Sequence, residues 1–197
     1  MNKLIVFITL LIGFSPLAYA QHETLFGNAR VVGGFGAPIF EYSLNNDLSR
    51  AVGGGGGVVI NNFFIGGYGM GSGDFNRLFR EDERLEKLDM GHGGFWLGFT
   101  IWPYKALHIY GSTRVGWGGL DIELRDNNQR FEDVDKIFIV TPEIGLELNV
   151  FRWFRIAGTV GYRWVDGISE GFSFDEEDFR GAIAGMTLRF GGFGWHR

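Results

Sequence analysis

His108 and Ser112 are the two residues of this chain whose types and spacing suggest nucleophilic catalysis. A histidine can take the proton of a serine hydroxyl, and a nearby carboxylate can orient the histidine ring. Glu143 or Glu147, on another segment, could supply that carboxylate. However, residues four apart on a strand have Cα atoms about 13 Å apart, which is too far for a nucleophile and its base. We therefore interpret the pair as ordinary hydrogen-bonding residues and keep an enzyme as the less favoured alternative.

A second candidate group consists of single charged residues that stand among apolar or small neighbours. Its members are Arg114, Glu143, Glu147, Arg155, Arg163 and Arg189, with Glu41 in a similar setting. A short turn at Phe151–Trp153 pairs Val150 with Phe154, so that paired residue numbers sum to 304. Glu147 then faces Ala157 with Arg155 diagonal to it. Glu143 faces Gly161 with Arg163 diagonal to it. Because buried charges need partners, we predict a charge network inside the fold.

Metal and cofactor chemistry has little support in the sequence. The chain has no cysteine, and its four histidines show no metal-ligand spacing. The glycine run 53–57 lacks the Lys-Ser/Thr of a phosphate loop. Asp175, Glu176, Glu177 and Asp178 form a weak candidate cation site, since clustered carboxylates suit Ca²⁺. We predict no cofactor, and the basic residues do not cluster with aromatics as nucleic-acid binding requires.

Three segments that carry these residues alternate between apolar and small or polar side chains: Leu107–Trp117, Phe138–Val150 and Phe154–Trp164. Side chains alternate across a strand, so each segment presents one continuous apolar stripe. Each is close to the roughly ten residues that a tilted strand needs to cross a bilayer.

The whole chain contains eight strand candidates. They are Arg30–Ser43, Arg50–Ile60, Phe63–Ser72, Gly94–Trp102, Leu107–Trp117, Ile137–Val150, Phe154–Val165 and Phe179–Phe190. The connections Asn61-Asn62, Pro103–Ala106 and Phe151–Trp153 are tight turns, whereas Gly73–Gly93, Gly118–Lys136 and Asp166–Asp178 are long and polar. We expect an irregularity at Pro38, which lacks a backbone donor, and a short helix within Phe75–Leu88. The sequence predicts a single antiparallel up-and-down barrel.

Residues 1–20 have the features of a cleaved export signal. Lys3 precedes the apolar run Leu4–Phe14, and small residues at Ala18 and Ala20 suit a signal peptidase. The run is too short for a spanning helix, although an N-terminal anchor stays an alternative. Cleavage leaves residues 21–197 as one domain and changes the formal charge from −5 to −6.

Alternation alone does not decide whether the apolar stripes face a bilayer or a dry interior. A secreted soluble barrel would present a water face rich in lysine and glutamate. Here that face is mostly Gly, Ala, Ser and Thr, and no strand candidate contains a lysine. Trp102, Tyr104 and Trp153 lie at the short-turn rim, and Trp117 and Trp164 near the other, as in the aromatic girdles of membrane barrels. These features favour a transmembrane β-barrel.

The chain resembles the small eight-stranded outer-membrane barrels of the OmpX type and of the OmpA transmembrane domain. The resemblance rests on the architecture and on the segments GGGGGVVINN, FFIGGYGMG and FRGAIAGMTLRF. It implies the outer membrane of a Gram-negative-type bacterium, contact with lipid and barrel-assembly machinery, and a monomer. Such proteins commonly end on an aromatic residue, whereas this chain continues as Gly191–Arg197, so Phe190 or Trp195 would serve as the assembly signal.

The charge distribution points to one acidic rim. The segments Asp74–Asp89, Asp121–Lys136 and Asp166–Asp178 each hold six acidic residues, and the last holds no base. We place these loops outside the cell, where they would be solvated or would bind divalent cations or basic partners. The predicted function is a non-enzymatic barrel with a filled lumen and a structural or surface-interaction role. A narrow transport or binding barrel, and a lipid-modifying hydrolase, are the alternatives.

Overall fold

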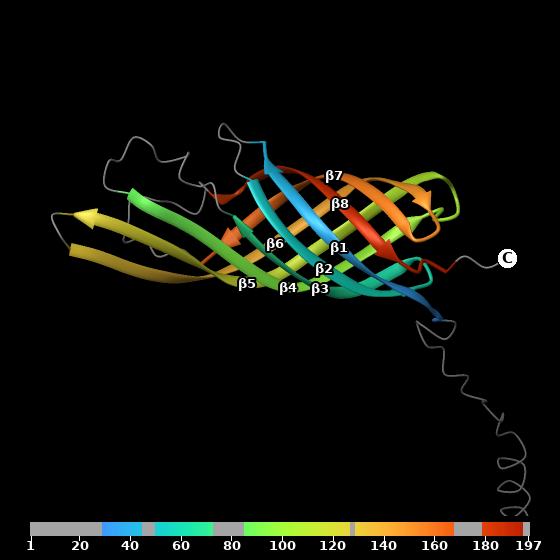
Figure 1. Cartoon of the computed structure of the whole chain (residues 1–197), viewed down its shortest axis with the longest axis horizontal. Coiled ribbons are helices and arrows are strands. Elements are labelled where there is room, and N and C mark those ends of the chain that lie inside the picture. Colours follow the sequence, from blue (N-terminus) through green and yellow to red (C-terminus); the bar gives the residue numbers. More distant parts are fainter. Residues whose placement is uncertain (1–28, 45–49, 73–84, 127–128, 168–178, 195–197) are drawn as a thin grey trace, which may run out of the picture.

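The computed structural model describes residues 29–44, 50–72, 85–126, 129–167 and 179–194. These residues form eight antiparallel strands that close into a barrel in sequence order, each strand pairing with the next and β8 pairing with β1 (Figure 1). The strands are β1 (Val31–Ser43), β2 (Arg50–Ile60), β3 (Phe63–Ser72), β4 (Leu85–Ile101), β5 (Leu107–Asp126), β6 (Gln129–Phe151), β7 (Phe154–Asp166) and β8 (Gly181–Gly191). The predicted all-β, up-and-down barrel is confirmed.

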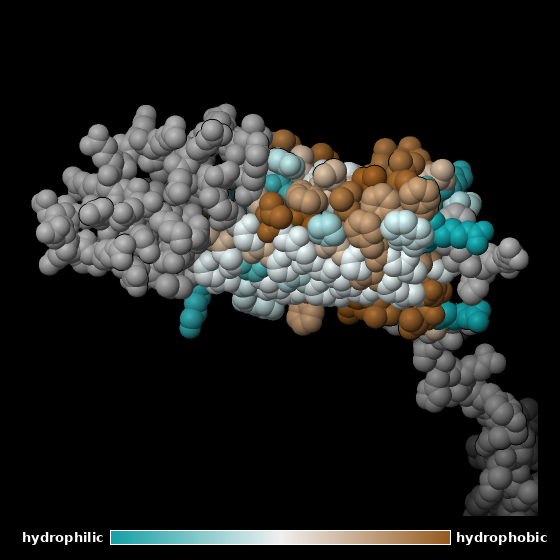
Figure 2. Space-filling view, viewed as in Figure 1, coloured by the Kyte–Doolittle hydropathy of each residue, from teal (hydrophilic) through white to brown (hydrophobic). Residues whose placement is uncertain are grey.

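Apolar side chains face outward from the barrel wall. On β6, Ile144, Leu146 and Leu148 are exposed, whereas Glu143 and Glu147, which alternate with them, are buried. The same alternation places Val160 outside and Arg163 inside on β7. Figure 2 shows hydrophobic residues gathered on the wall toward the end of the barrel where the tight turns lie. This arrangement is the reverse of a soluble barrel, whose apolar face points inward.

Three tight turns join the strands at one end of the barrel, as predicted (Figure 1). Asn61 has a φ of 53°, in the left-handed region that asparagine tolerates at a hairpin turn. Asn149 Nδ2 donates to the carbonyl oxygens of Pro103 and Lys105, which ties β6 to the β4–β5 turn. On β6 and β7, Glu147 faces Ala157 and Glu143 faces Gly161, as the sum of 304 predicts. Close to the turn the prediction is wrong, because Phe154 pairs with Phe151 after a register shift at Val150.

Strands β4, β5 and β6 are longer than the sequence analysis predicted. Residues 85–93, 118–126 and 129–136 are strand rather than loop. Residues 90–93 pair with β3, and beyond them β4, β5 and β6 form a sheet that projects past the other strands (Figure 1). The expected helix within Phe75–Leu88 is also wrong in its described part, because Leu85 and Leu88 lie in β4. These segments are rich in charged residues, and their polarity alone suggested loops. The backbone hydrogen bonds between adjacent strands stabilise these extensions of β4, β5 and β6.

Two smaller predictions are tested at β1 and β8. The register shift in β1 lies between Val31 and Gly33, and Pro38 stays in register with β2. On the other side of the strand, the ladder with β8 is interrupted at Ala37 and Pro38, so the irregularity expected at Pro38 is present there. The last strand begins at Gly181, two residues after the predicted start at Phe179. The expected export signal 1–20 and the acidic cluster 175–178 lie outside the described residues. Within the described ranges, no helix has the length and apolar character needed to cross a bilayer.

Candidate functional site

The interior of the barrel carries buried charged residues from five of the strands, β1, β5, β6, β7 and β8. They form two groups. The Glu41 cluster consists of Glu41, Ser112, Arg114, Glu143, Thr159 and Arg163. The Glu147 cluster consists of His108, Glu147, Arg155 and Arg189. Alternation along each strand turns these residues inward, since they occupy every second position between outward apolar residues.

Glu41 connects strands that are distant in the sequence. One carboxylate oxygen of Glu41 on β1 accepts a hydrogen bond from Arg114 on β5. The other accepts from Nη1 of Arg163 on β7 at 3.1 Å. Neither arginine is exposed by more than a few per cent. Charge-assisted hydrogen bonds to both oxygens satisfy a carboxylate that would otherwise be costly to bury.

Glu143 completes this cluster from β6. Ser112 Oγ donates to its Oε1 at 2.6 Å, and Thr159 Oγ1 donates to its Oε2 at 2.9 Å. Arg114 Nε lies 3.6 Å from Oε1, within ion-pair distance. Arg114 therefore lies between two carboxylates, and its Nη1 also points at the sulfur of Met70 on β3. Nearby, Tyr68 Oη is 3.2 Å from Nδ1 of His92.

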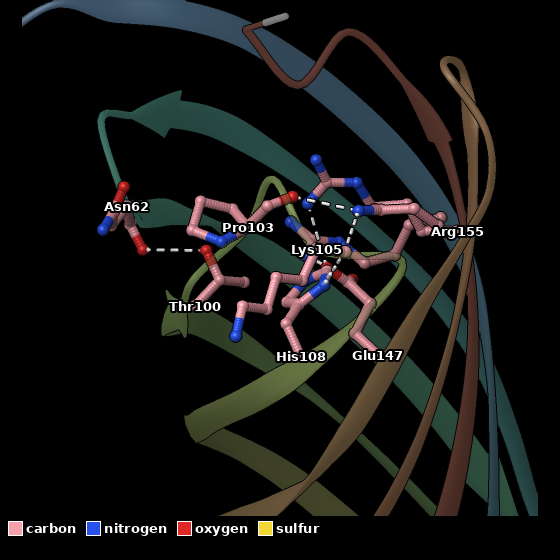
Figure 3. Close-up of polar contacts among 9 residues, drawn as sticks. Asn62, Thr100, Pro103, Lys105, His108, Glu147 and Arg155 are labelled. Atoms are coloured by element: carbon pink, nitrogen blue, oxygen red, sulfur yellow. Dashed lines mark hydrogen bonds and ion pairs between the residues drawn. The ribbon is translucent and has the colours of Figure 1, made fainter.

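The Glu147 cluster lies toward the tight turns (Figure 3). Glu147 Oε2 is 2.8 Å from Nε2 of His108 and accepts from Arg155 Nη1 at 3.0 Å. Its Oε1 accepts from Arg189 Nη1 at 2.7 Å. One fully buried carboxylate thus binds three cationic or polar side chains from β5, β7 and β8.

Aromatic rings surround the guanidinium of Arg189. The carbon Cζ lies 3.9 Å from the ring centroid of Phe35, 4.6 Å from that of Phe64 and 5.2 Å from that of Phe193. Phe64 and Trp96 pack edge-to-face at 5.2 Å. Cations over aromatic faces are attracted by the ring quadrupole, most strongly where water is excluded. These rings therefore stabilise the positive charge of Arg189, which Glu147 neutralises only in part.

The structure brings all six predicted interior charges into these clusters, with one change of partner. Glu147 and Arg155 are in contact across the predicted diagonal, whereas Arg163 reaches Glu41 rather than Glu143. Sequence reasoning noted Glu41 only as a single charge and missed its partners. A contact between β1 and β5 depends on closure of the barrel, which leaves no local signal. Phe193, whose burial was also missed, follows the last strand.

His108 and Ser112 contact different carboxylates. His108 Nε2 is bound to Glu147, whereas Ser112 Oγ donates to Glu143. The serine hydroxyl and the histidine ring therefore each contact a different carboxylate, and they are not arranged as a nucleophile and its base. In the described residues, no three His, Cys, Asp or Glu side chains are grouped as a metal site would require.

No protein-family model and no curated protein matches the sequence. The fold, however, matches solved outer-membrane barrels. The N-terminal β-barrel domain of Pseudomonas aeruginosa OprF aligns with a TM-score of 0.53 at 10% identity, over 82% of this chain and 98% of that domain. Neisserial surface protein A aligns with a TM-score of 0.51 at 9% identity, over 81% of this chain and 92% of that one. The chain therefore has the fold of the small eight-stranded outer-membrane barrels.

Proposed function

We propose that the protein resides in the outer membrane, with its tight turns toward the periplasm. The predicted export signal, the outward apolar residues and the likeness to outer-membrane barrels all support this location. Exposed aromatic residues occur at two levels, with Trp102 and Trp153 beside the tight turns and Trp117 and Trp164 farther along the strands. On β5, ten residues at a tilt of about 40° rise about 25 Å, close to the height of the apolar band in such barrels.

We infer that the protein acts at the cell surface through the projecting sheet, formed by residues 85–89, 121–126 and 129–137. The observation that carries this proposal is the length of β5 and β6. β5 continues from Trp117 to Asp126, which extends it roughly 20 Å past the upper aromatic level. A long ordered projection of this kind is not needed to span the bilayer, and it presents main chain and charge to the outside.

The preferred partner of the projecting sheet is a basic polypeptide segment. The strands carry an excess of acidic residues, and Glu123 and Glu132 occupy opposite positions in the β5–β6 ladder. Like charges at opposite positions destabilise a strand pair, and a cation between them relieves that cost. In the described residues, Gln129–Ile137 forms its ladder with β5, and we propose that the partner adds as a strand along its other edge. Strand addition combines main-chain hydrogen bonds with charge complementarity.

Binding of a fluorescent lysine-rich peptide to the refolded protein in nanodiscs tests this role. We expect saturable binding that weakens with added salt, because exposed charges are screened over about 8–10 Å at physiological ionic strength. A variant with Asp121, Glu123, Glu132, Asp133 and Asp135 changed to their amides should bind much more weakly. A matched control variant, in which the charges of Lys105 and Arg152 at the tight turns are neutralised instead, should bind like the parent. Equal binding by all three proteins would contradict the proposal.

We further propose that the lumen is filled and passes no steady current. Glu41 and Arg114 meet from opposite walls, and the Glu147 cluster occupies the end toward the tight turns. The measurement is planar-bilayer recording of the purified protein. Stable channels of porin size would contradict a filled lumen and favour the alternative, a narrow transport barrel.

The role we propose is non-enzymatic, and it is supported by the separate engagement of His108 and Ser112 with two carboxylates. A hydrolase assay on phospholipid vesicles tests the enzyme alternative, and activity lost in Ser112→Ala would contradict our view.

We also propose that the protein is a monomer and that barrel-assembly machinery recognises it at Phe190. This ring faces outward beside Phe154, with the two centroids 4.8 Å apart. The Ca²⁺ site at Asp175–Asp178 stays a prediction that calorimetry can test.

A further inference from the structure

Two arginines face each other inside the barrel near the tight turns. Arg155 on β7 and Arg189 on β8 are directly opposite in the ladder, and both are buried. Like charges at such positions repel, since their Cβ atoms are only about 4.5–5.5 Å apart. Glu147 is the one carboxylate that the described residues bring to the pair. The Glu147 cluster therefore holds more positive than negative charge even before His108 is considered.

The hydrogen bonds of the cluster show the same shortage of acceptors. Nε of Arg155 and Nε of Arg189 are both buried, and neither has a hydrogen-bond partner among the residues that the structure describes. Glu147 cannot serve them, because its oxygens already accept from Arg155 Nη1 and Arg189 Nη1 and contact His108. His108 Nδ1 also lies 3.1 Å from the carbonyl oxygen of Lys105, so both ring nitrogens face acceptors. A buried N–H without an acceptor costs about 1–3 kcal/mol, and more when it belongs to a charged group.

Phe193 covers this acceptor-poor pair. Its ring lies 4.0 Å from Arg155 Cζ and 5.2 Å from Arg189 Cζ, measured to the centroid, and it stacks near Phe35. The main-chain bonds that attach this segment are those of Gly191 to Trp153 and of Gly192 to Gly34. Phe193 follows them and precedes Gly194, which has a φ of 72°. Phe193 lies after the end of β8 and is buried in the hydrophobic core, with Gly194 beside Val32, so its ring can move without breaking the barrel ladder.

We propose that Arg155 and Arg189 form a binding site for a small oxyanion, a free phosphate or carboxylate, which Phe193 closes at the end of the lumen near the tight turns. The oxyanion accepts from the two free Nε–H groups and supplies the missing negative charge. Arginine suits this role because its planar fork of donors matches carboxylate and phosphate oxygens. Phe193 shields the bound ion from water and must move for the ion to enter.

Calorimetric titration of inorganic phosphate into the refolded protein in nanodiscs, with sodium chloride balancing the ionic strength, tests the site. We expect saturable binding to the parent protein. Arg189→Gln should weaken phosphate binding by about tenfold or more, the effect of losing one charge-assisted hydrogen bond. Arg189→Lys keeps the charge but lacks the Nε–H, and it should also bind more weakly than the parent. Arg152→Gln, at the exposed β6–β7 turn, is the matched control and should bind like the parent.

Phe193→Ala removes the ring that covers the site and retains every charge of the Glu147 cluster. It therefore tests the covering role of Phe193 separately from the affinity for phosphate. We expect phosphate to associate faster with this variant in a stopped-flow experiment, because the covering ring is gone. Heat-modifiable migration in electrophoresis identifies the variants that fold. An absence of saturable binding to both the parent and Phe193→Ala would overturn the proposal. Equal phosphate affinity of the parent and a folded Arg189→Gln protein would overturn it as well.

Discussion

Glu41 on β1 and Arg114 on β5 form an ion pair that crosses the barrel between opposite walls. In a closed ring of eight strands, β5 is four strands from β1 in either direction. The pair therefore forms only when the barrel has closed. Glu41 also binds Arg163 on β7, two strands from β1, so one carboxylate on the first strand binds two guanidinium groups.

Replacing Glu41 should destabilise the protein strongly. Glu41→Gln keeps the size of the side chain but leaves Arg114 and Arg163 without the charge that they share. Removing one partner of a buried ion pair typically costs ~3–5 kcal/mol, and we expect a loss of this size. The measurement is the free energy of unfolding in urea, with the protein refolded into lipid vesicles.

Asp166→Asn is the control for this measurement, because the carboxylate of Asp166 is 74% exposed and lies 4.0 Å from Arg180. Exposed changes of this kind usually alter stability by no more than about 0.5 kcal/mol. Equal losses in the two variants would mean that the Glu41 ion pairs contribute little.

Two glycines of β3 should respond differently to alanine. Gly66 faces the interior, and a Cβ there would collide with the backbone carbonyl of Gly56 on β2. Gly69 has nothing within 4 Å of the Cβ position. We expect Gly66→Ala to lower the free energy of unfolding by about 1–3 kcal/mol or more, the usual cost of overpacking, and Gly69→Ala to leave it nearly unchanged. The opposite order would contradict the β2–β3 register.

The proposed orientation predicts a pattern of cysteine labelling on intact cells. Asp133→Cys, in the projecting sheet, should react with a membrane-impermeant thiol reagent. Asn62→Cys, at the β2–β3 turn, should not react until the outer membrane is opened. The chain has no native cysteine, so the signal has no background from this protein. Labelling of Asn62→Cys alone would reverse the orientation.

The barrel could be predicted from the sequence because a bilayer imposes a strict alternation on each strand that crosses it. Outward residues such as Ile144 and Leu146 must be apolar, and this period of two is visible without a structure. The same reasoning missed residues 118–126, because a strand with water on both sides need not present an apolar face. Leu120, Ile122 and Leu124 do alternate with charged residues, and this pattern could have indicated the extension of β5.

The interior clusters could be predicted only where strands are neighbours. The short β6–β7 turn sets a register, so the contact between Glu147 and Arg155 follows from residue numbers alone. The contacts of Glu41 join strands that are not neighbours, and they depend on tilt and closure. Phe193 follows the last strand, where no periodicity indicates the direction of a side chain.

Heat-modifiable migration of the protein from the outer-membrane fraction is the most direct test of the central claim, that this chain folds as a closed transmembrane barrel. A closed barrel leaves no strand edge in the bilayer and resists detergent until it is boiled. We predict that unboiled and boiled samples migrate at different positions in gel electrophoresis. A single position for both samples, or recovery of the mature protein in the soluble periplasmic fraction, would contradict the account.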